Sequence, residues 1–388
     1  MKNTTHISSD IQRLKVMTIV GTRPEIIRLS RTIPKLDQYC DHVLVHTGQN
    51  YDYELNQIFF DDLGVRAPDV FLECAGATAA TTIAEVITKS DEQFERYQPD
   101  ALLILGDTNS AMAAIPAKRR KIPIFHMEAG NRCFDLRVPE EINRKVVDHI
   151  SDINMPYSDI AREHLLMEGI RPDMIVKSGS PMDEVLSHYH TKIVDSDILS
   201  RLNFVENKYF VVSVHREENL DSDYNIRKFV EMLNLLAKHH GLPIFVSTHP
   251  RTRQKIDQLN LTFDDLVQLR KPLGFTDYIK LQTLAKVVLS DSGTISEESS
   301  LLNFPAINLR DAHERPEGME EGAVMFTGMN HHRVFQAIEV LAEQGRGESR
   351  TLRLVADYSA PNVSDKVLRT IISYTDYVNR VVWRKSYE

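Results

Sequence analysis

Short apolar runs alternate with amphipathic segments along most of this chain. The clearest run is Ala101–Leu105 (ALLIL), which is apolar at every position and is followed by Gly106 and Asp107. Such runs are typical of strands buried on both faces, and their alternation with helices predicts parallel sheets covered by helices. The other expected strands are Lys15–Val20, His42–Thr47, Ile122–Met127, Tyr209–Val214, Pro243–Thr248, Val287–Ser290 and Pro305–Leu309.

The pattern starts again after a polar, charged stretch at Thr191–Asn207. We therefore predict an α/β protein with two Rossmann-like, doubly wound domains, at residues 15–190 and 191–362. Residues 1–14 are expected to be a flexible leader, and the C-terminal helix within 363–388 is expected to pack back on the first domain. The expected helices are Ile26–Leu36, a helix near Tyr53–Leu63, Asn225–His240, Thr276–Ala285, Ile295–Asn303 and Val363–Val382.

Composition and charge narrow the possible functions. The 388 residues include 46 Lys and Arg against 55 Asp and Glu, a net charge of −9, which argues against binding to nucleic acid or to an anionic membrane. Three cysteines (Cys40, Cys74 and Cys133) are too few for a disulfide framework, which favours a cytoplasmic protein. The chain has no apolar run of membrane-spanning length, no HExxH, no Walker motif and no GxGxxG. We therefore expect no metal and no ATP or NAD cofactor.

Chemically reactive side chains follow six of the expected strands. In open α/β sheets ligands bind beyond the carboxyl ends of the strands, so these segments predict one site in a cleft between the domains. Three segments come from each half, and they are Gly21–Glu25, Gly106–Thr108, Glu128–Gly130, His215–Asn219, Thr248–Arg251 and Asp291–Thr294.

Three carboxylates of the first half are candidates for a general acid and a general base. Asp107 and Glu128 end buried strands, where desolvation can raise a carboxyl pKa toward the range of acid–base catalysis. Glu140 lies at the start of a helix and is equally compatible with a structural role in the helix dipole. Arg144 is either a substrate contact or an i,i+4 partner of Glu140.

Arginines and a helix N-terminus predict an anion site. Arg23 suits a phosphate clamp in a strand-to-helix turn, although a turn arginine is often only solvated. Arg28 and Arg315 could add positive charge, and the alternative for Arg315 is a surface loop. Ser292 and Gly293 open a helix whose backbone N–H groups favour a phosphate, and the alternative is an ordinary N-cap serine.

Two histidines, His215 and His249, end strands of the second half. A single histidine in such a position is more often a satisfied polar residue than a catalyst. Two on one wall of the same cleft favour a functional role.

Taken in order, these motifs resemble the non-hydrolysing UDP-N-acetylglucosamine 2-epimerase family from about Lys15 to about Gly328. The resemblance implies a GT-B-like pair of domains, an isomerase acting on a UDP-linked 2-acetamido sugar, no cofactor or metal, and a homodimer. The matching motifs are GTRPE (Gly21–Glu25), GDT (Gly106–Thr108), EAG (Glu128–Gly130), PEExNR (Pro139–Arg144), HRxEN (His215–Asn219), DSGxxxEE (Asp291–Glu298) and ERPEG (Glu314–Gly318).

The resemblance also implies roles for individual residues. Glu298 would hold the ribose, and the Pro272–Phe275 loop would hold the uracil. The implied catalytic residues are Asp107, Glu128, Glu140 and His215. The implied substrate contacts are Arg23, Arg28, Arg144, Arg216, His249, Phe275, Ser292, Gly293, Glu298 and Arg315.

The sequence departs from the family pattern in places. The family's Glu-Ala-Gly-Leu-Arg-Thr stands here as Glu128–Cys133 (EAGNRC), and the loop from there to Pro139 is shorter. Arg28 replaces a family lysine. The Gln-His-Arg stretch of a second, allosteric site reads Gln49–Tyr51, which puts such activation in doubt.

The segments Gly21–Ser30 and Thr47–Tyr53 resemble one branch more closely. This branch is UDP-2-acetamido-2,6-dideoxy-L-talose 2-epimerase, or UDP-N-acetyl-L-fucosamine synthase, of capsule and O-antigen pathways. It predicts a 6-deoxy substrate, with Cys133 and Phe134 as an apolar wall for the C6 methyl group. The open alternatives are UDP-N-acetylglucosamine as substrate, giving UDP-N-acetylmannosamine, and, more distantly, a GT-B glycosyltransferase.

Overall fold

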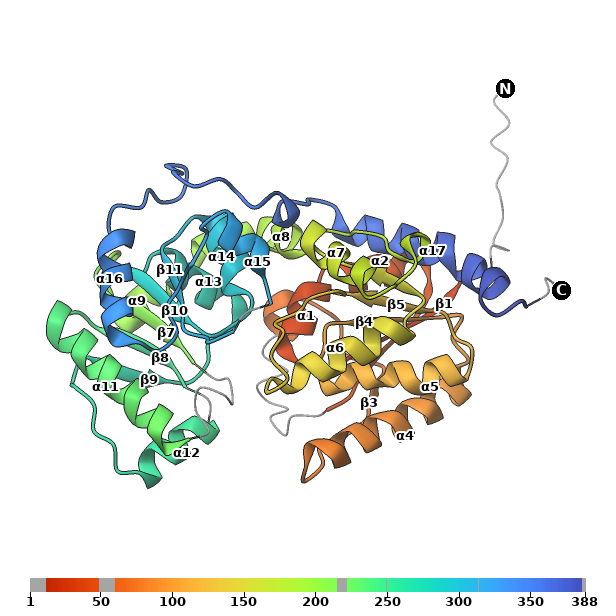
Figure 1. Ribbon diagram of the computed structural model, residues 1–388, viewed down its shortest axis with the longest axis horizontal. Coiled ribbons are helices and arrows are strands. Elements are labelled where there is room, and N and C mark those ends of the chain that lie inside the picture. The colour runs from red at the N-terminus through yellow and green to blue at the C-terminus, as the bar shows by residue number, and fades with distance from the viewer. Residues whose placement is uncertain (1–11, 49–59, 215–221, 249, 313, 386–388) are drawn as a thin grey trace.

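The computed structural model describes residues 12–48, 60–214, 222–248, 250–312 and 314–385. Its strands form two six-stranded sheets in which every pair is parallel (Figure 1). The first sheet has the order β3-β2-β1-β4-β5-β6 and the second β12-β11-β10-β7-β8-β9. Both sheets thus share one doubly wound order, and the predicted α/β fold class is confirmed. The strands are β1 (Lys15–Val20), β2 (Asp41–His46), β3 (Val70–Phe71), β4 (Ala101–Leu105), β5 (Ile124–Met127), β6 (Ile153–Met155), β7 (Phe210–Ser213), β8 (Ile244–Ser247), β9 (Val267–Arg270), β10 (Val287–Ser290), β11 (Ala306–Asn308) and β12 (Met325–Phe326).

Helices cover both faces of each sheet (Figure 1). The apolar run of β4 supplies both faces, because Leu103 and Leu105 join one buried cluster while Leu102 and Ile104 join another. This division explains why the strand is apolar at every position. The helices are α1 (Arg23–Leu29), α2 (Thr32–Tyr39), α4 (Ala79–Tyr97), α5 (Ala114–Arg119), α6 (Pro139–Ile150), α7 (Asp159–Met167), α8 (Met182–Asp195), α9 (Ile198–Leu202), α11 (Asp223–His240), α12 (Pro250–Gln258), α13 (Phe275–Thr283), α14 (Ile295–Leu302), α15 (Pro316–Glu320), α16 (His331–Leu341) and α17 (Val363–Val381).

One predicted helix is wrong in its extent. The segment Ile26–Leu36 is two helices, α1 and α2, separated at Ser30 and Arg31. Pro34 explains the break, because a proline inside a continuous helix lacks the N–H donor and its ring clashes with the carbonyl four residues earlier. In α2 the proline instead occupies the first turn. Of the helix predicted near Tyr53–Leu63, residues 60–63 are helical and the rest lies outside the described residues.

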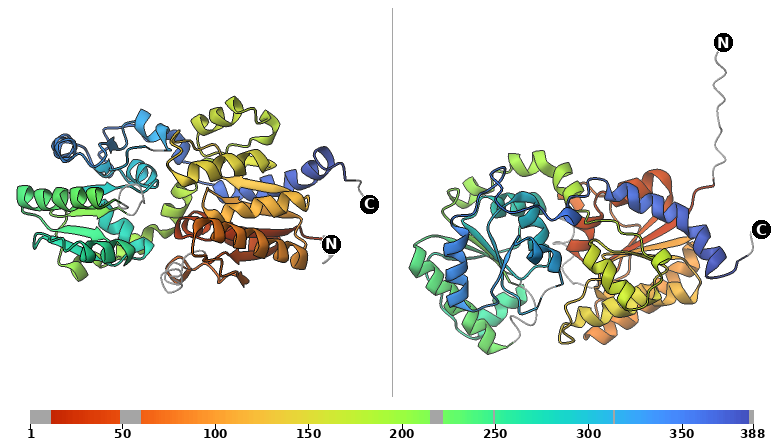
Figure 2. Two further views of the ribbon diagram at one scale, coloured as in Figure 1. Left: turned by 60° about the horizontal axis from the view of Figure 1, so that its bottom comes forward. Right: turned by 45° about the horizontal axis from the view of Figure 1, so that its top comes forward.

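The C-terminal helix returns to the first sheet. Val363, Val367 and Ile371 of α17 share a buried cluster with Val16 and Leu36 from the β1–α2 region. Both views in Figure 2 show α17 lying along the first domain, far from the second sheet. The boundary predicted at residue 190 falls inside α8, a continuous helix, so the connection between the two halves includes regular structure.

Side chains at the carboxyl ends of the central strands connect the two halves. Arg28 of α1 binds Glu297 of α14 through two hydrogen bonds, and Glu128 after β5 binds Arg315 before α15. The carboxyl ends of the two sheets therefore face each other, which is the arrangement that places a ligand between such domains.

Candidate active site

Glu25 joins the turns that follow β1 and β4. Its Oε2 accepts hydrogen bonds from the backbone N–H groups of Gly21 (2.5 Å) and Thr22 (3.2 Å), and its Oε1 accepts one from Thr108 Oγ1 (2.6 Å). Burial raises the pKa of Glu25 to about 7, although the hydrogen bonds from Thr108, Gly21 and Thr22 oppose the rise. This side chain, which sequence reasoning did not select, fixes the spacing of the first two motifs.

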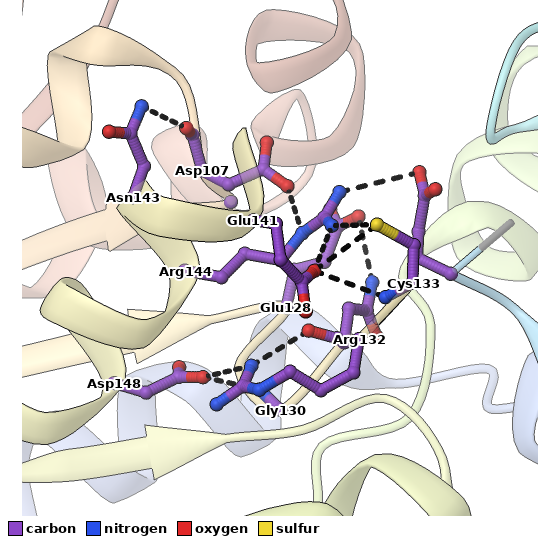
Figure 3. Close-up of polar contacts among 12 residues, drawn as sticks. Asp107, Glu128, Gly130, Arg132, Cys133, Glu141, Asn143, Arg144 and Asp148 are labelled. Carbon is purple, nitrogen blue, oxygen red and sulfur yellow. Dashed lines mark hydrogen bonds and ion pairs between the residues drawn. The ribbon is translucent and has the colours of Figure 1, made fainter. Parts of the chain in front are cut away.

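Asp107 lies beyond β4 in contact with a buried guanidinium group. Arg144 Nε of α6 is 2.5 Å from Asp107 Oδ2, and Arg144 Nη1 is 2.9 Å from Glu141 Oε2 (Figure 3). Asn143 Nδ2 donates to the Asp107 carbonyl oxygen at 2.9 Å. Burial alone would lower the pKa of Arg144, but Asp107 and Glu314 raise it, so the group stays charged. Glu141, three residues before Arg144, is thus a partner of Arg144 that sequence reasoning missed.

Glu128 lies beyond β5 in an unusual backbone conformation. Its φ angle is 64°, in the left-handed region that non-glycine residues seldom adopt. Its Oε1 is 2.5 Å from Arg315 Nη2, and its Oε2 is 3.7 Å from Arg28 Nη1. The conformation therefore directs the carboxylate toward cations from both halves of the chain.

Glu297 completes a buried cluster between the two sheets. It binds both terminal nitrogens of Arg28, accepts a short hydrogen bond from Ser180 Oγ, and lies 3.5 Å from Arg315. Burial would raise the pKa of Glu297, but the two arginines lower it overall. The ring of Tyr157 lies 5.4 Å from Arg28 Cζ and 6.0 Å from Arg315 Cζ, in cation–π contact.

The second half contributes the turn after β10. Ser292 Oγ lies 3.0 Å from Thr294 Oγ1 and accepts a hydrogen bond from the Thr294 N–H, and Thr294 is the N-cap of α14. Ser292 thus makes a capping contact at the start of this helix, as its structural alternative expected, although the N-cap position itself is Thr294. A Cβ atom on Gly293 would lie 2.9 Å from Glu314 Oε1, so this position leaves little room for a side chain. Glu298 is buried and accepts from Gln282 Nε2 at 3.0 Å.

Five of the candidates belong to two sets of ion pairs that each cross between the sheets. Arg144 pairs with Asp107 and with Glu314, and Arg28 and Arg315 both pair with Glu128 and Glu297. Arg315 is almost fully buried, so its surface-loop alternative is wrong.

Three further candidates lie on α1, α6 and α13. Arg23 and Glu140 are half-buried residues in the first turns of α1 and α6. Phe275 is buried in the core with its ring edge-on to Tyr189 at 6.0 Å, so the ring is not open to a ligand. His215, Arg216 and His249 lie outside the described residues.

Sequence reasoning also missed Glu297 and Glu314. Each stands inside a motif already recognised, Glu297 beside Glu298 and Glu314 beside Arg315. The available signal was the presence of several arginines in these motifs without enough assigned acidic partners, because buried charges need opposite charges.

A known family matches most of the chain. The UDP-N-acetylglucosamine 2-epimerase family matches residues 35–372. The chain belongs to this family. The predicted enzyme class, an isomerase, is thereby confirmed, and family membership favours an epimerase over a glycosyltransferase of the same architecture.

Individual members of the family have different names. A relative from Methanocaldococcus jannaschii, named UDP-N-acetylglucosamine 2-epimerase, is 33% identical over 343 residues, which cover 86% of this chain and 93% of the relative. A UDP-2,3-diacetamido-2,3-dideoxy-D-glucuronate 2-epimerase from Pseudomonas aeruginosa is 32% identical over 320 residues, which cover 81% and 88%.

Solved structures of family members resemble this fold closely. The UDP-N-acetylglucosamine 2-epimerase from Rickettsia bellii is 50% identical with a TM-score of 0.90, covering 96% of this chain and all of its own. The M. jannaschii enzyme in complex with UDP-N-acetylglucosamine and UDP is 30% identical with a TM-score of 0.86, covering 93% and 100%.

The described part of the chain offers neither a cluster of metal ligands nor a membrane-spanning helix. It contains no group of three or more His, Cys, Asp or Glu side chains that could hold a metal ion. None of its helices is both long and apolar enough to cross a membrane.

Proposed function

We propose that this epimerase inverts C2 of a UDP-linked 2-acetamido sugar by eliminating UDP and adding it back. The observation that supports the proposal most is the pair of carboxylates, Asp107 and Glu128, at the ends of adjacent strands beside arginines from both halves. Carboxylates can move a proton, and the arginines can hold the anionic leaving group.

Elimination answers the main chemical difficulty of this reaction. A C2–H bond beside an acetal carbon is barely acidic, and general-base help contributes only about 10²–10⁴ in rate, whereas enzymes typically supply about 10⁶ or more. In the proposed step a carboxylate takes the C2 proton, the C–H electron pair forms a C1=C2 double bond, and the C1–O bond breaks toward UDP. The reverse step adds a proton to the opposite face of C2 and rebuilds the bond to UDP.

The residues divide into two groups in this proposal. Asp107, Glu128 and Glu140 exchange the proton, in an order that we leave open. The diphosphate binds Arg23, Arg28 and Arg315, the Ser292–Gly293 turn and His215. Arg144, Arg216 and His249 are further proposed contacts, the two arginines near the sugar and the phosphates. Glu298 contacts the ribose. The Pro272–Phe275 loop contacts the uracil, and it does so through residues other than Phe275, whose ring is buried.

The ion pairs of Arg28 and Arg315 bear on this division of roles. Arg315 binds Glu128 at 2.5 Å, and Arg28 binds Glu297. In the proposed complex the diphosphate competes with these carboxylates for the same guanidinium groups. Substrate binding would then release Glu128 for proton transfer at the time when the sugar arrives.

We further propose UDP-2-acetamido-2,6-dideoxy-L-talose as the substrate, giving UDP-N-acetyl-L-fucosamine. Cys133 Sγ lies 3.6 Å from Arg144 Nη1, close to the Asp107 contact, and can present an apolar surface to a C6 methyl group. Phe134 is 73% exposed and its ring is edge-on to His164 of α7 at 5.3 Å, so we assign the methyl contact to Cys133. The names of the relatives favour the alternative, UDP-N-acetylglucosamine.

Two measurements test these proposals. In D₂O the product should carry deuterium at C2 by proton NMR, and a product without it would exclude the elimination mechanism.

The value of kcat/KM for the 6-deoxy sugar should exceed that for UDP-N-acetylglucosamine, because an apolar wall disfavours a hydroxyl by up to about 10²-fold. Equal values would return the enzyme to the UDP-N-acetylglucosamine assignment.

A further inference from the structure

A buried network of charged side chains lies behind the two turns that carry Asp107 and Glu128. It consists of His126 from β5, Asp148 from α6, and Arg132 from the segment between β5 and α6 (Figure 3 labels Arg132 and Asp148). Arg132 and Asp148 have fully buried side chains and His126 is 1% exposed. Charges this deeply buried have a large desolvation penalty, so their arrangement calls for a structural or functional reason.

His126 faces an acceptor on each side of its ring. Its Nε2 is 2.8 Å from the Gly106 carbonyl oxygen, and its Nδ1 is 3.0 Å from Asp148 Oδ1. A carbonyl oxygen only accepts, so Nε2 carries a proton, and a bare Nδ1 lone pair would face a carboxylate. The Nδ1–Oδ1 contact is short but is not aligned as a hydrogen bond. An acceptor on one side and a carboxylate on the other favour protonation of both nitrogens, which is the imidazolium form.

The charges around this ring favour the same state. Asp148 approaches from α6, and Asp107 lies beyond the Gly106 carbonyl. Arg132 is the nearest cation in the network, and it is paired with Asp148 and with Glu168 of α7. Burial alone would lower the pKa of His126, but Asp148 and the Gly106 carbonyl raise it above its usual value.

The other side of the network holds the Glu128 turn. Asp148 Oδ2 accepts from the Gly130 N–H at 3.1 Å and from Arg132 Nη1 at 2.7 Å, and the same Nη1 donates to the Asn131 carbonyl oxygen. A single carboxylate thus joins the histidine that contacts the Asp107 turn to the backbone two residues after Glu128.

Both turns contain backbone conformations that need such support. Gly106 has a φ of 74° and Gly130 a φ of 82°, and a Cβ atom on Gly130 would lie 2.2 Å from the Ala161 carbonyl oxygen. Glu128, with φ 64°, carries the strain of the left-handed region as a non-glycine residue. Such conformations persist when surrounding contacts determine them, and they recur at functional sites.

We propose that His126 is a positioning residue for the epimerisation: as an imidazolium held by Asp148, it donates to the Gly106 carbonyl and fixes the Asp107 turn relative to the Glu128 turn. This inference rests on the proposed function, in which the two carboxylates must meet one carbon atom from set directions. A small displacement of either turn then lowers the rate of proton transfer without weakening the binding of the nucleotide.

Two variants of His126 distinguish a positioning role of this side chain from a role in packing alone. In His126→Gln the longer side chain can reach the Gly106 carbonyl with its amide N–H, whereas in His126→Asn the shorter one can reach only toward Asp148. We expect His126→Asn to lower kcat about ten- to hundredfold with KM nearly unchanged, and His126→Gln to retain kcat within about threefold. Equal losses in the two variants, or no loss in either, would overturn the proposal. Urea unfolding of both variants checks that they are equally stable.

A second measurement does not depend on activity or on the variants folding. In the wild-type protein labelled with ¹⁵N-histidine, NMR near pH 7 should show both ring nitrogens of His126 protonated. A neutral ring would overturn the inference. The kinetics use UDP-N-acetylglucosamine and UDP-2-acetamido-2,6-dideoxy-L-talose. If the wild type turns over neither, the proposed function fails, while the NMR result still tests the charge state that the proposal assigns to His126.

Discussion

At the scale of single residues, exchanging a carboxylate for an amide removes ionisation while keeping shape. We expect at least two of Asp107→Asn, Glu128→Gln and Glu140→Gln to lower kcat by about 10² or more, the usual contribution of general acid–base catalysis. Steady-state kinetics on the UDP-sugar measure the effect. Asp91→Asn is a matched control, because it removes an ion pair with Arg120 on the far surface and should leave kcat unchanged.

A contrary result for these variants would be informative. If two of the three amide variants turned over at the wild-type rate, the carboxylates would be structural partners of Arg144 and Arg315, and proton transfer would need other groups.

The proposed phosphate site leads to a second prediction at this scale. Arg23→Ala and Ser292→Ala should weaken UDP binding, and loss of a good Arg–phosphate pair corresponds to about 1.5–3 kcal/mol. Isothermal titration calorimetry with UDP measures this as roughly a ten- to hundredfold rise in Kd for Arg23→Ala. Arg120→Ala, at the C-terminal end of α5, is the control. An unchanged Kd in Arg23→Ala would remove the clamp from the proposal.

At the scale of elements, the start of α1 depends on the protonation of Glu25. Its folded-state pKa of about 7 lies above the ordinary value of 4.5, so its stabilising effect is complete below about pH 4.5 and is lost as the pH rises through 7. The loss amounts to at most about 3 kcal/mol. Glu25→Gln should remove this part of the pH dependence, because an amide does not ionise.

Urea unfolding at about pH 5 and pH 8 measures this effect. The free energy of unfolding of the wild type should fall more between the two pH values than that of Glu25→Gln. Parallel changes in the two proteins would show that Glu25 is ionised throughout, stabilised by its hydrogen-bond donors.

The sequence predicts the extent of a strand well where an apolar run has clear ends. The strands β1, β4 and β10 begin and end where the apolar runs do, because those runs are bounded by polar residues or glycine. The break between α1 and α2 depended on Pro34, whose effect local periodicity alone did not reveal. The motifs indicated which turns follow strands in the site, because ligands bind beyond the carboxyl ends of parallel strands.

Pairing between distant segments could not be read from sequence in the same way. The choice of Asp107 by Arg144, and of Glu297 by Arg28, depends on how α6 and α14 pack against the neighbouring turns. Sequence spacing does not determine such contacts, because residues 28 and 297 are brought together only by the arrangement of the two sheets. The same reason explains why Phe275 was expected at a ligand and is found in the core.

At the scale of the whole molecule, the expected homodimer remains a prediction. Size-exclusion chromatography with light scattering should give about twice the 44.4 kDa mass of the chain. A monomeric mass at micromolar concentration would contradict it. The sites of Asp107 and Glu128 involve residues of one chain, so this outcome does not affect the proposed chemistry.

The two halves are joined by a buried ion pair, and its removal should affect the stability of the whole chain. Glu297→Gln leaves Arg28 and Arg315 buried with less negative charge, because Glu128 is then the remaining carboxylate that pairs with both of them in the described part of the chain. Breaking a buried pair from one side typically costs about 3–5 kcal/mol. We expect a loss of that size in urea unfolding for Glu297→Gln, and a smaller loss for the double variant Arg28→Met/Glu297→Leu, in which no charge is left unpaired by the exchange. A double variant less stable than Glu297→Gln would show that the ion pair itself, and not the unpaired arginine, determines how strongly the two halves hold together.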